Sequence, residues 1–118
     1  METTSVVARG VRGSPRSRVT LPAAVFSNHF YCPVEVACTD LSASGMFLAA
    51  DLLLGPGERI TVSFTVPGTW HKITTDAMVV RSPRGLPSGM GLRFDRLPSL
   101  DGSILKAALA RCRVAELS

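Results

Sequence analysis

Ile60-Thr-Val-Ser-Phe-Thr-Val66, followed by Pro67-Gly68, is the stretch that decides the fold class of this chain. Apolar side chains occupy every second position, and Thr or Ser occupies each position between them. Such period-two alternation, rich in β-branched residues, is typical of a β-strand. The Pro-Gly pair then predicts a tight turn. The stretch therefore indicates a β-rich domain with a strand at 60–66.

Similar strand patterns occur on both sides of this stretch. Five further segments carry apolar residues in alternation or in a brief run, at 19–25, 34–38, 46–48, 70–81 and 90–94. Short strands separated by turn residues favour a small antiparallel barrel. Closing the sheet would remove exposed strand edges. We therefore expect an all-β domain.

The pattern changes its period near the C-terminus. Leu100, Ile104, Ala108 and Cys112 recur every four residues, which predicts an amphipathic helix at about 99–113. Such a helix needs an apolar surface to cover, and the mouth or flank of the barrel provides one. Trp70 follows the Pro-Gly turn, and we expect it to be a partly buried anchor.

Length and composition restrict the class of protein. The chain has 118 residues, 46% of them hydrophobic, which fits one domain with a core. Its three cysteines follow no disulfide or zinc spacing, and two of them, Cys38 and Cys112, read as buried thiols. There is no secretory signal and no apolar run long enough to span a membrane. We therefore expect a cytoplasmic domain without metal or membrane insertion.

Arginines dominate the first 18 residues, which read as a polar arm. Arg12 and Arg16 form an R-x-x-x-R motif in this segment. Guanidinium groups suit planar, bidentate recognition of phosphates. Taken alone, however, the motif is also typical of a solvated arm in a chain with many arginines. The same reading applies to Arg18. Arg81 and Arg93 lie on later predicted strands, where they could approach a bound ligand, but a surface position is favoured for both.

A second motif lies at the end of the second predicted strand. Asp40, Ser42 and Gly45 form D-x-S-x-x-G. Taken alone, this pattern is typical of a structural turn, because Asp and Ser bond to the local backbone and Gly permits sharp bends. A carboxylate and a hydroxyl in this place can also bind a polar ligand.

With both motifs in this order and on this strand pattern, the sequence resembles the PilZ domain family. Gly89-Met-Gly-Leu-Arg-Phe94 is also similar to that family. The resemblance covers essentially the whole chain. It implies a six-stranded antiparallel PilZ-type β-barrel at 19–118 with a C-terminal helix, preceded by a flexible arm at 1–18. It also implies binding of cyclic di-GMP, a bacterial second messenger.

The residue types suit that ligand, which has two phosphates and two guanines. Arg12 and Arg16 would bind phosphates and the Hoogsteen edges of guanine, and would stack on a guanine face. Asp40 would accept from guanine N–H donors, and Ser42 would hydrogen-bond a polar edge of the ligand. Gly45 would permit either a close approach or a positive φ. These five residues are the predicted ligand-binding site.

The resulting hypothesis is a receptor that signals through a protein partner. Binding would order residues 9–18 against the barrel and change its affinity for an unidentified effector protein. One alternative is a degenerate PilZ adaptor that binds protein without nucleotide. Another is a basic barrel that binds nucleic acid through its arginine arm. The sequence holds no P-loop, Rossmann glycine pattern or paired catalytic carboxylates, so we expect no enzyme.

Overall fold

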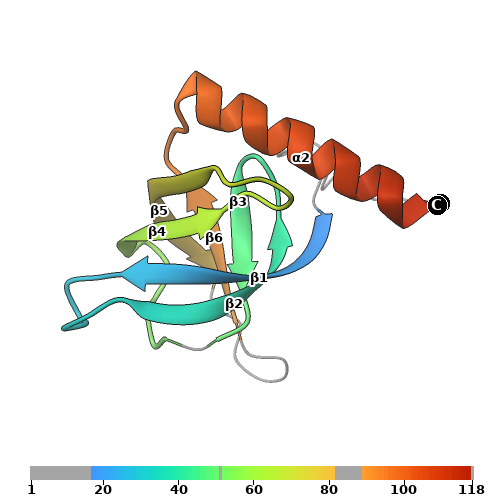
Figure 1. The fold of residues 1–118 in the computed structure, drawn as a ribbon. Coiled ribbons are helices and arrows are strands. Elements are labelled where there is room, and N and C mark those ends of the chain that lie inside the picture. Colours follow the sequence, from blue (N-terminus) through green and yellow to red (C-terminus); the bar gives the residue numbers. More distant parts are fainter. Residues whose placement is uncertain (1–16, 51, 82–88, 118) are drawn as a thin grey trace.

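A computed structural model describes residues 17–50, 52–81 and 89–117, the last segment with its side chains only as far as residue 112. Within these residues six antiparallel strands close into a barrel, in the order β1-β2-β3-β6-β5-β4, and one helix follows (Figure 1). The elements are β1 (Ser17–Phe26), β2 (Val34–Leu41), β3 (Gly45–Leu48), β4 (Arg59–Thr65), β5 (Lys72–Arg81), β6 (Met90–Phe94) and α2 (Ser99–Leu117). The predicted six-stranded barrel with a C-terminal helix is confirmed.

The core fills the inside of the barrel with the apolar residues of the alternating strands. In β4, Ile60, Val62 and Phe64 are buried, as their alternation predicts. Phe64 stacks on Phe94 of β6, with ring centroids 5.9 Å apart. Burying each large apolar side chain stabilises the fold by about 1.5–3 kcal/mol. The sheet therefore holds its shape because every strand contributes such residues to one interior.

Three register shifts interrupt the strand pairing. They lie between Arg18 and Leu21 in the β1–β2 pair, between Cys38 and Asp40 in the β2–β3 pair, and between Val79 and Arg81 in the β5–β6 pair. At a bulge one strand carries an extra residue, so the strand bends and the side chains beyond it can exchange faces. The shifts in β2 and β5 change which residues face solvent.

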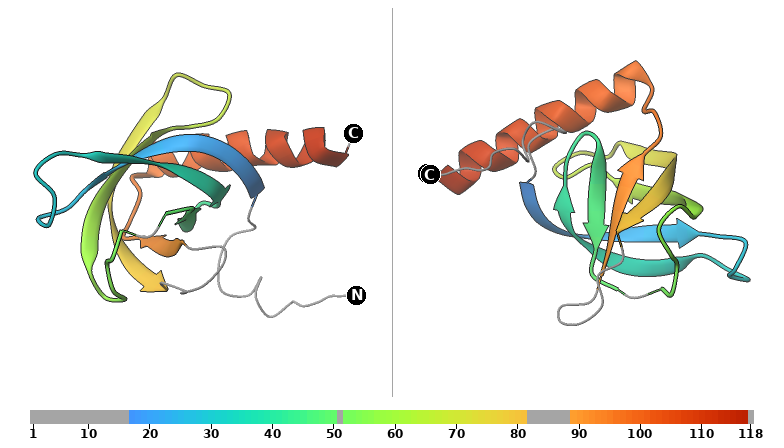
Figure 2. Two further views of the ribbon diagram at one scale, coloured as in Figure 1. Left: turned by 90° about the horizontal axis from the view of Figure 1, so that it is seen from below. Right: turned by 180° about the vertical axis from the view of Figure 1, so that it is seen from behind.

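The helix α2 lies across one end of the barrel, and its C-terminal half passes beside the start of β1 (Figures 1 and 2). Leu105, Ala108 and Leu109, on the side of α2 that packs on the barrel, are buried. Leu100, predicted to belong to the buried stripe, is 66% exposed, because it lies a full turn before the first residue that packs on the barrel. Among the described residues, no helix is both long and apolar enough to cross a bilayer.

The helix also continues beyond its predicted end. It was expected at about 99–113 and runs to Leu117. The additional residues, 114–117, include no Gly or Pro, and residues of these types are compatible with a helix. The helix propensity of these residues therefore extends α2 past Cys112, the last residue of the predicted apolar stripe.

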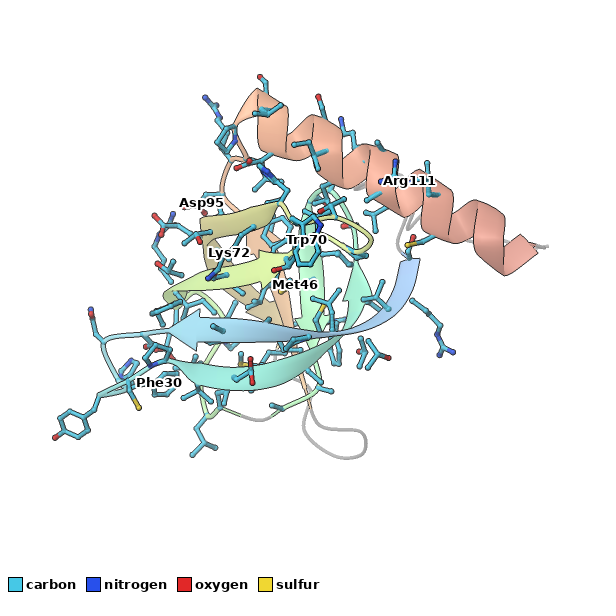
Figure 3. All side chains as sticks on the ribbon, viewed as in Figure 1. Phe30, Met46, Trp70, Lys72, Asp95 and Arg111 are labelled. Carbon is cyan, nitrogen blue, oxygen red and sulfur yellow. The ribbon has the colours of Figure 1, made fainter. Side chains whose placement is uncertain are left out.

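The β4–β5 hairpin reaches the start of α2 through one polar contact. His71 Nε2 lies 2.6 Å from Asp101 Oδ1, and both side chains are partly buried. The prediction that Trp70 is a partly buried anchor is wrong, because its side chain is 99% exposed (Figure 3). The hairpin extends beyond the barrel wall, so its tip offers Trp70 no apolar surface to pack on (Figure 2).

The cysteines differ in their surroundings. Cys38 is fully buried, as predicted, and burial raises the pKa of its thiol to about 12. It therefore stays protonated and behaves as a small apolar side chain. Cys112 is only half-buried, because it lies toward the end of α2 that extends past the barrel, whereas Cys32 is exposed.

We predict that Leu105→Ala destabilises the protein by about 2–5 kcal/mol, because the change leaves a cavity between α2 and the barrel. Leu100→Ala is the matched control, since it removes the same side chain from an exposed position of the same helix. It should alter stability by no more than about 0.5 kcal/mol. Urea denaturation followed by circular dichroism measures both. Equal effects of the two changes would contradict the packing described for α2.

Candidate functional site

Asp40 faces solvent near the end of β2, where it pairs with Arg18 of β1 and Phe47 of β3. Its side chain is half-buried, and no described residue forms a hydrogen bond or an ion pair with its carboxylate. The residue lines a depression of about 520 Å³, together with Arg18, Val19, Thr20 and Thr39. That volume lies in the usual range of small-molecule sites. Asp40 is thus an available hydrogen-bond acceptor in an open recess.

The register shift in β2 is what turns Asp40 outward. Cys38 pairs with Leu48 and Asp40 pairs with Phe47, so β2 advances two residues while β3 advances one. Without the extra residue, strict alternation from the buried Cys38 would point Asp40 into the core and Leu41 into solvent. Instead Leu41 is fully buried and Asp40 faces the recess.

Ser42 shapes the turn between β2 and β3. Its Oγ accepts hydrogen bonds from the backbone N–H of Gly45 at 3.1 Å and of Ser44 at 3.2 Å. The backbone N–H of Ser42 in turn donates to the Gly45 carbonyl at 2.9 Å. The Ser42 side chain is buried, so in this structure the hydroxyl is occupied by the turn itself.

Gly45 is required by a close approach between strands. It pairs with Arg93 at the start of β3, and a Cβ at this position would overlap the carbonyl oxygen of Leu92 in β6. Its φ is not positive, since among the described glycines only Gly57 and Gly68 have positive φ. Of the two predicted reasons for this glycine, close approach is therefore the correct one, and the surface approached here is β6.

The arginine motif lies outside the described residues, so Arg12 and Arg16 have no position here. Arg16 directly precedes Ser17, the first residue of β1, and Ser17 pairs with Leu41. The chain therefore enters the barrel next to the turn that carries Asp40 and Ser42. The buried Oγ of Ser17 has no hydrogen-bond partner among the described residues.

A second pair of side chains lies on the same outer wall. Arg81 of β5 extends over Phe47 of β3, with its guanidinium carbon 5.8 Å from the ring centroid. Phe47 is the residue paired with Asp40, so this cation lies one strand away from the carboxylate. The sequence favours a surface position for Arg81 over an approach to a ligand, and it does not predict the contact with Phe47. The signal that could have found the pair is Gly89-Met-Gly91, whose glycines leave room beside Phe47 and Arg81.

The β2–β3 turn and the recess beside Asp40 lie on the outer wall of the barrel, whose interior is filled by the core. The chain belongs to the PilZ domain family, which matches residues 11–111. The matched segment includes both the arginine motif and the turn that carries Asp40. A search of curated proteins finds no significant match.

Solved structures share the fold at low sequence identity. The Bacillus subtilis inhibitor of motility, MotI/DgrA, has a TM-score of 0.74 and 20% identity, with 88% of this chain and 51% of that chain covered. This chain thus spans about half the length of MotI/DgrA. The PilZ domain of Escherichia coli YcgR, solved with c-di-GMP, has a TM-score of 0.68 and 15% identity, with 89% and 93% covered. The PilZ domain of CeSA from a cellulose-synthesizing bacterium has a TM-score of 0.56 and 18% identity, with 87% and 99% covered.

We predict that Gly45→Ala lowers stability by about 1–3 kcal/mol, because the added methyl group would push β3 away from β6. Gly102→Ala is the matched control, since Gly102 lies in α2 with open space where a Cβ would be. It should raise stability by about 0.5–1 kcal/mol through helix propensity. Thermal unfolding distinguishes the two. A Gly45→Ala protein as stable as the wild type would refute the close approach of the strands.

Proposed function

We propose that this protein is a receptor for cyclic di-GMP and binds it on the outer wall beside the β2–β3 turn. The observation that carries the proposal is the Asp40 carboxylate, which faces an open recess without a partner among the described residues. Leaving a partly desolvated carboxylate without donors is unfavourable, so a ligand with N–H donors is favoured there. The Watson–Crick edge of guanine offers such donors.

The arginine motif supplies the complementary chemistry. Arg12 and Arg16 would bind the ligand phosphates and the acceptor edge of guanine through charge-assisted hydrogen bonds. Their place in the chain supports this role, since residue 16 directly precedes β1 and β1 pairs with the end of β2. A carboxylate and two guanidinium groups together match a dianionic ligand that carries two guanines.

The other two motif residues have a different part in the proposed site. Ser42 and Gly45 hold the turn and pack it against β6, which keeps Asp40 at the end of β2. Ser42 could bond a ligand only by exchanging one of its turn contacts. We therefore assign recognition to Asp40, Arg12 and Arg16, and assign the shape of the turn mainly to Ser42 and Gly45.

The comparisons support the ligand. The PilZ domain of Escherichia coli YcgR was solved with c-di-GMP, and it has the same barrel over most of both chains. A further structure of YcgR in complex with c-di-GMP covers 91% of this chain, with a TM-score of 0.69. The proposed role is recognition in the cytoplasm rather than catalysis.

The N-terminal arm would couple ligand binding to recognition by a partner protein. In the proposed mechanism, bound ligand holds the part of residues 9–18 that precedes β1 against the outer wall and so creates a surface that an effector protein recognises. Ser17 and Arg18 already pair with β2. The ligand shifts this equilibrium only by its differential affinity for the two arrangements. The partner is a protein that distinguishes the held arm from the free one.

Isothermal titration calorimetry with cyclic di-GMP tests the ligand. We expect saturable binding by the wild type, with GMP as the nucleotide control. Arg16→Ala and Asp40→Ala should each weaken binding by roughly thirtyfold or more, because the first leaves a ligand phosphate without its cation and the second leaves guanine N–H donors without their acceptor. Arg111→Ala and Asp76→Ala, at exposed positions elsewhere, should leave the affinity unchanged.

Circular dichroism must show that all four variants are folded. If the folded wild type gives neither heat nor a thermal shift at excess ligand, the receptor hypothesis is wrong and a protein adaptor without nucleotide replaces it. Binding to DNA or RNA with a steep salt dependence, in place of the dinucleotide, would instead support a nucleic-acid protein.

Tryptic cleavage tests the role of the arm. Cyclic di-GMP should slow cleavage after Arg12 and Arg16, because a segment held on the barrel cannot enter the protease. Mass spectrometry of a cleavage time course measures the effect at each site. Asp40→Ala, which should not bind, is expected to show no protection. Unchanged cleavage of the wild type at saturating ligand would rule out the proposed ordering of the arm.

A further inference from the structure

We propose that Arg81, supported by Phe47, is an additional ligand-binding residue on which a guanine base stacks. This inference rests on the proposed function and extends its site from β2 across β3 and β6 to β5. It assigns a role to two residues that belong to neither sequence motif.

Register places the relevant residues in one row across the outer wall. Asp40 pairs with Phe47, Phe47 pairs with Gly91, and Gly91 pairs with Arg81. On the other side, Asp40 pairs with Arg18 of β1. Neighbouring strands lie about 4.8 Å apart, so these residues form a continuous band over five strands. Phe47 and Gly91 occupy the middle of this band.

A bulge points Arg81 to the outside. Val79 pairs with Leu92 and Arg81 pairs with Gly91, so β5 advances two residues while β6 advances one. The alternation of β5, in which Ile73, Ala77 and Val79 are buried, would otherwise point Arg81 inward. Bulges of this kind are common at the rims of barrels and next to active sites, where they re-aim one side chain.

The side chain of Arg81 then crosses β6 toward β3. A Cβ on Gly91 would lie 3.3 Å from Arg81 Nε, so the side chain passes close over this glycine. Its guanidinium carbon ends 5.8 Å from the centre of the Phe47 ring, within the distance of a cation–π contact. A Cβ on Gly89 would overlap the Phe47 ring. The two glycines therefore make the space in which ring and guanidinium meet.

The contact with Phe47 restrains the Arg81 guanidinium in a position where a planar base can stack on it. Arg81 remains exposed, while Phe47 supports its guanidinium from below. A guanidinium that is already restrained loses less conformational entropy when a base stacks on it. The cation also lies one strand from the Asp40 carboxylate. One guanine can thus donate to Asp40 while the same ligand stacks on Arg81.

Calorimetry with cyclic di-GMP tests this assignment in the full-length chain. Arg81→Ala should weaken binding by roughly tenfold, since it removes the stacking surface and its charge. Arg81→Lys should weaken binding by a similar factor, because an ammonium keeps the charge but has no planar face. Arg96→Ala is the matched control, an exposed arginine beyond the end of β6 and away from the recess beside Asp40, and it should bind as the wild type does.

Phe47→Leu tests the support, because it keeps an apolar side chain but removes the ring. This change and Arg81→Ala should be non-additive in the double variant, since both act through one contact. Thermal unfolding confirms that each variant is folded. If the wild type binds but Arg81→Ala binds equally well, this inference alone is overturned. If Arg81→Lys retains full affinity, the stacking role is overturned. If the wild type does not bind at all, both the inference and the proposed function are overturned.

Discussion

The barrel can close only if every strand keeps an apolar face toward one interior, and β1, β2 and β5 each carry an extra residue where their pairing shifts. In β2 the extra residue lies between Cys38 and Asp40, and in β5 it lies between Val79 and Arg81. Each bulge lets a strand bend around the core without exposing its buried side chains. In β2 it also keeps Leu41 in the core beyond the bend. The proposed ligand surface depends on this arrangement.

The same two bulges place opposite charges on the outer wall. Asp40 and Arg81 both stand at positions that simple alternation assigns to the interior, where an unpaired charge would be strongly unfavourable. Turned outward, they lie on either side of Phe47 in one row of paired residues. A carboxylate, an aromatic ring and a guanidinium thus come from three different strands. The bulges that let the barrel close therefore also place the charges of the proposed ligand surface.

The D-x-S-x-x-G motif combines two residues that hold the turn with the proposed recognition residue, Asp40. Ser42 holds the turn by accepting two backbone hydrogen bonds, and Gly45 lets β3 approach the carbonyl of Leu92. Only the carboxylate of Asp40 remains without a described partner. The motif is informative in the sequence because a stable turn, held by Ser42 and Gly45, and an available carboxylate on Asp40 must occur together at a fixed spacing. A turn without the carboxylate would fold but would lose the acceptor of the proposed ligand site.

The sequence alone determined the fold class, the six strands, the C-terminal helix and the motif that carries Asp40, because local periodicity and turn residues encode these features directly. Only the tertiary structure decided that Trp70 and Leu100 are exposed, since packing partners are absent where the chain projects past the barrel. It also decided which way Arg81 points. A bulge depends on the register of two strands that pair across a loop, and no pattern within one strand reveals it.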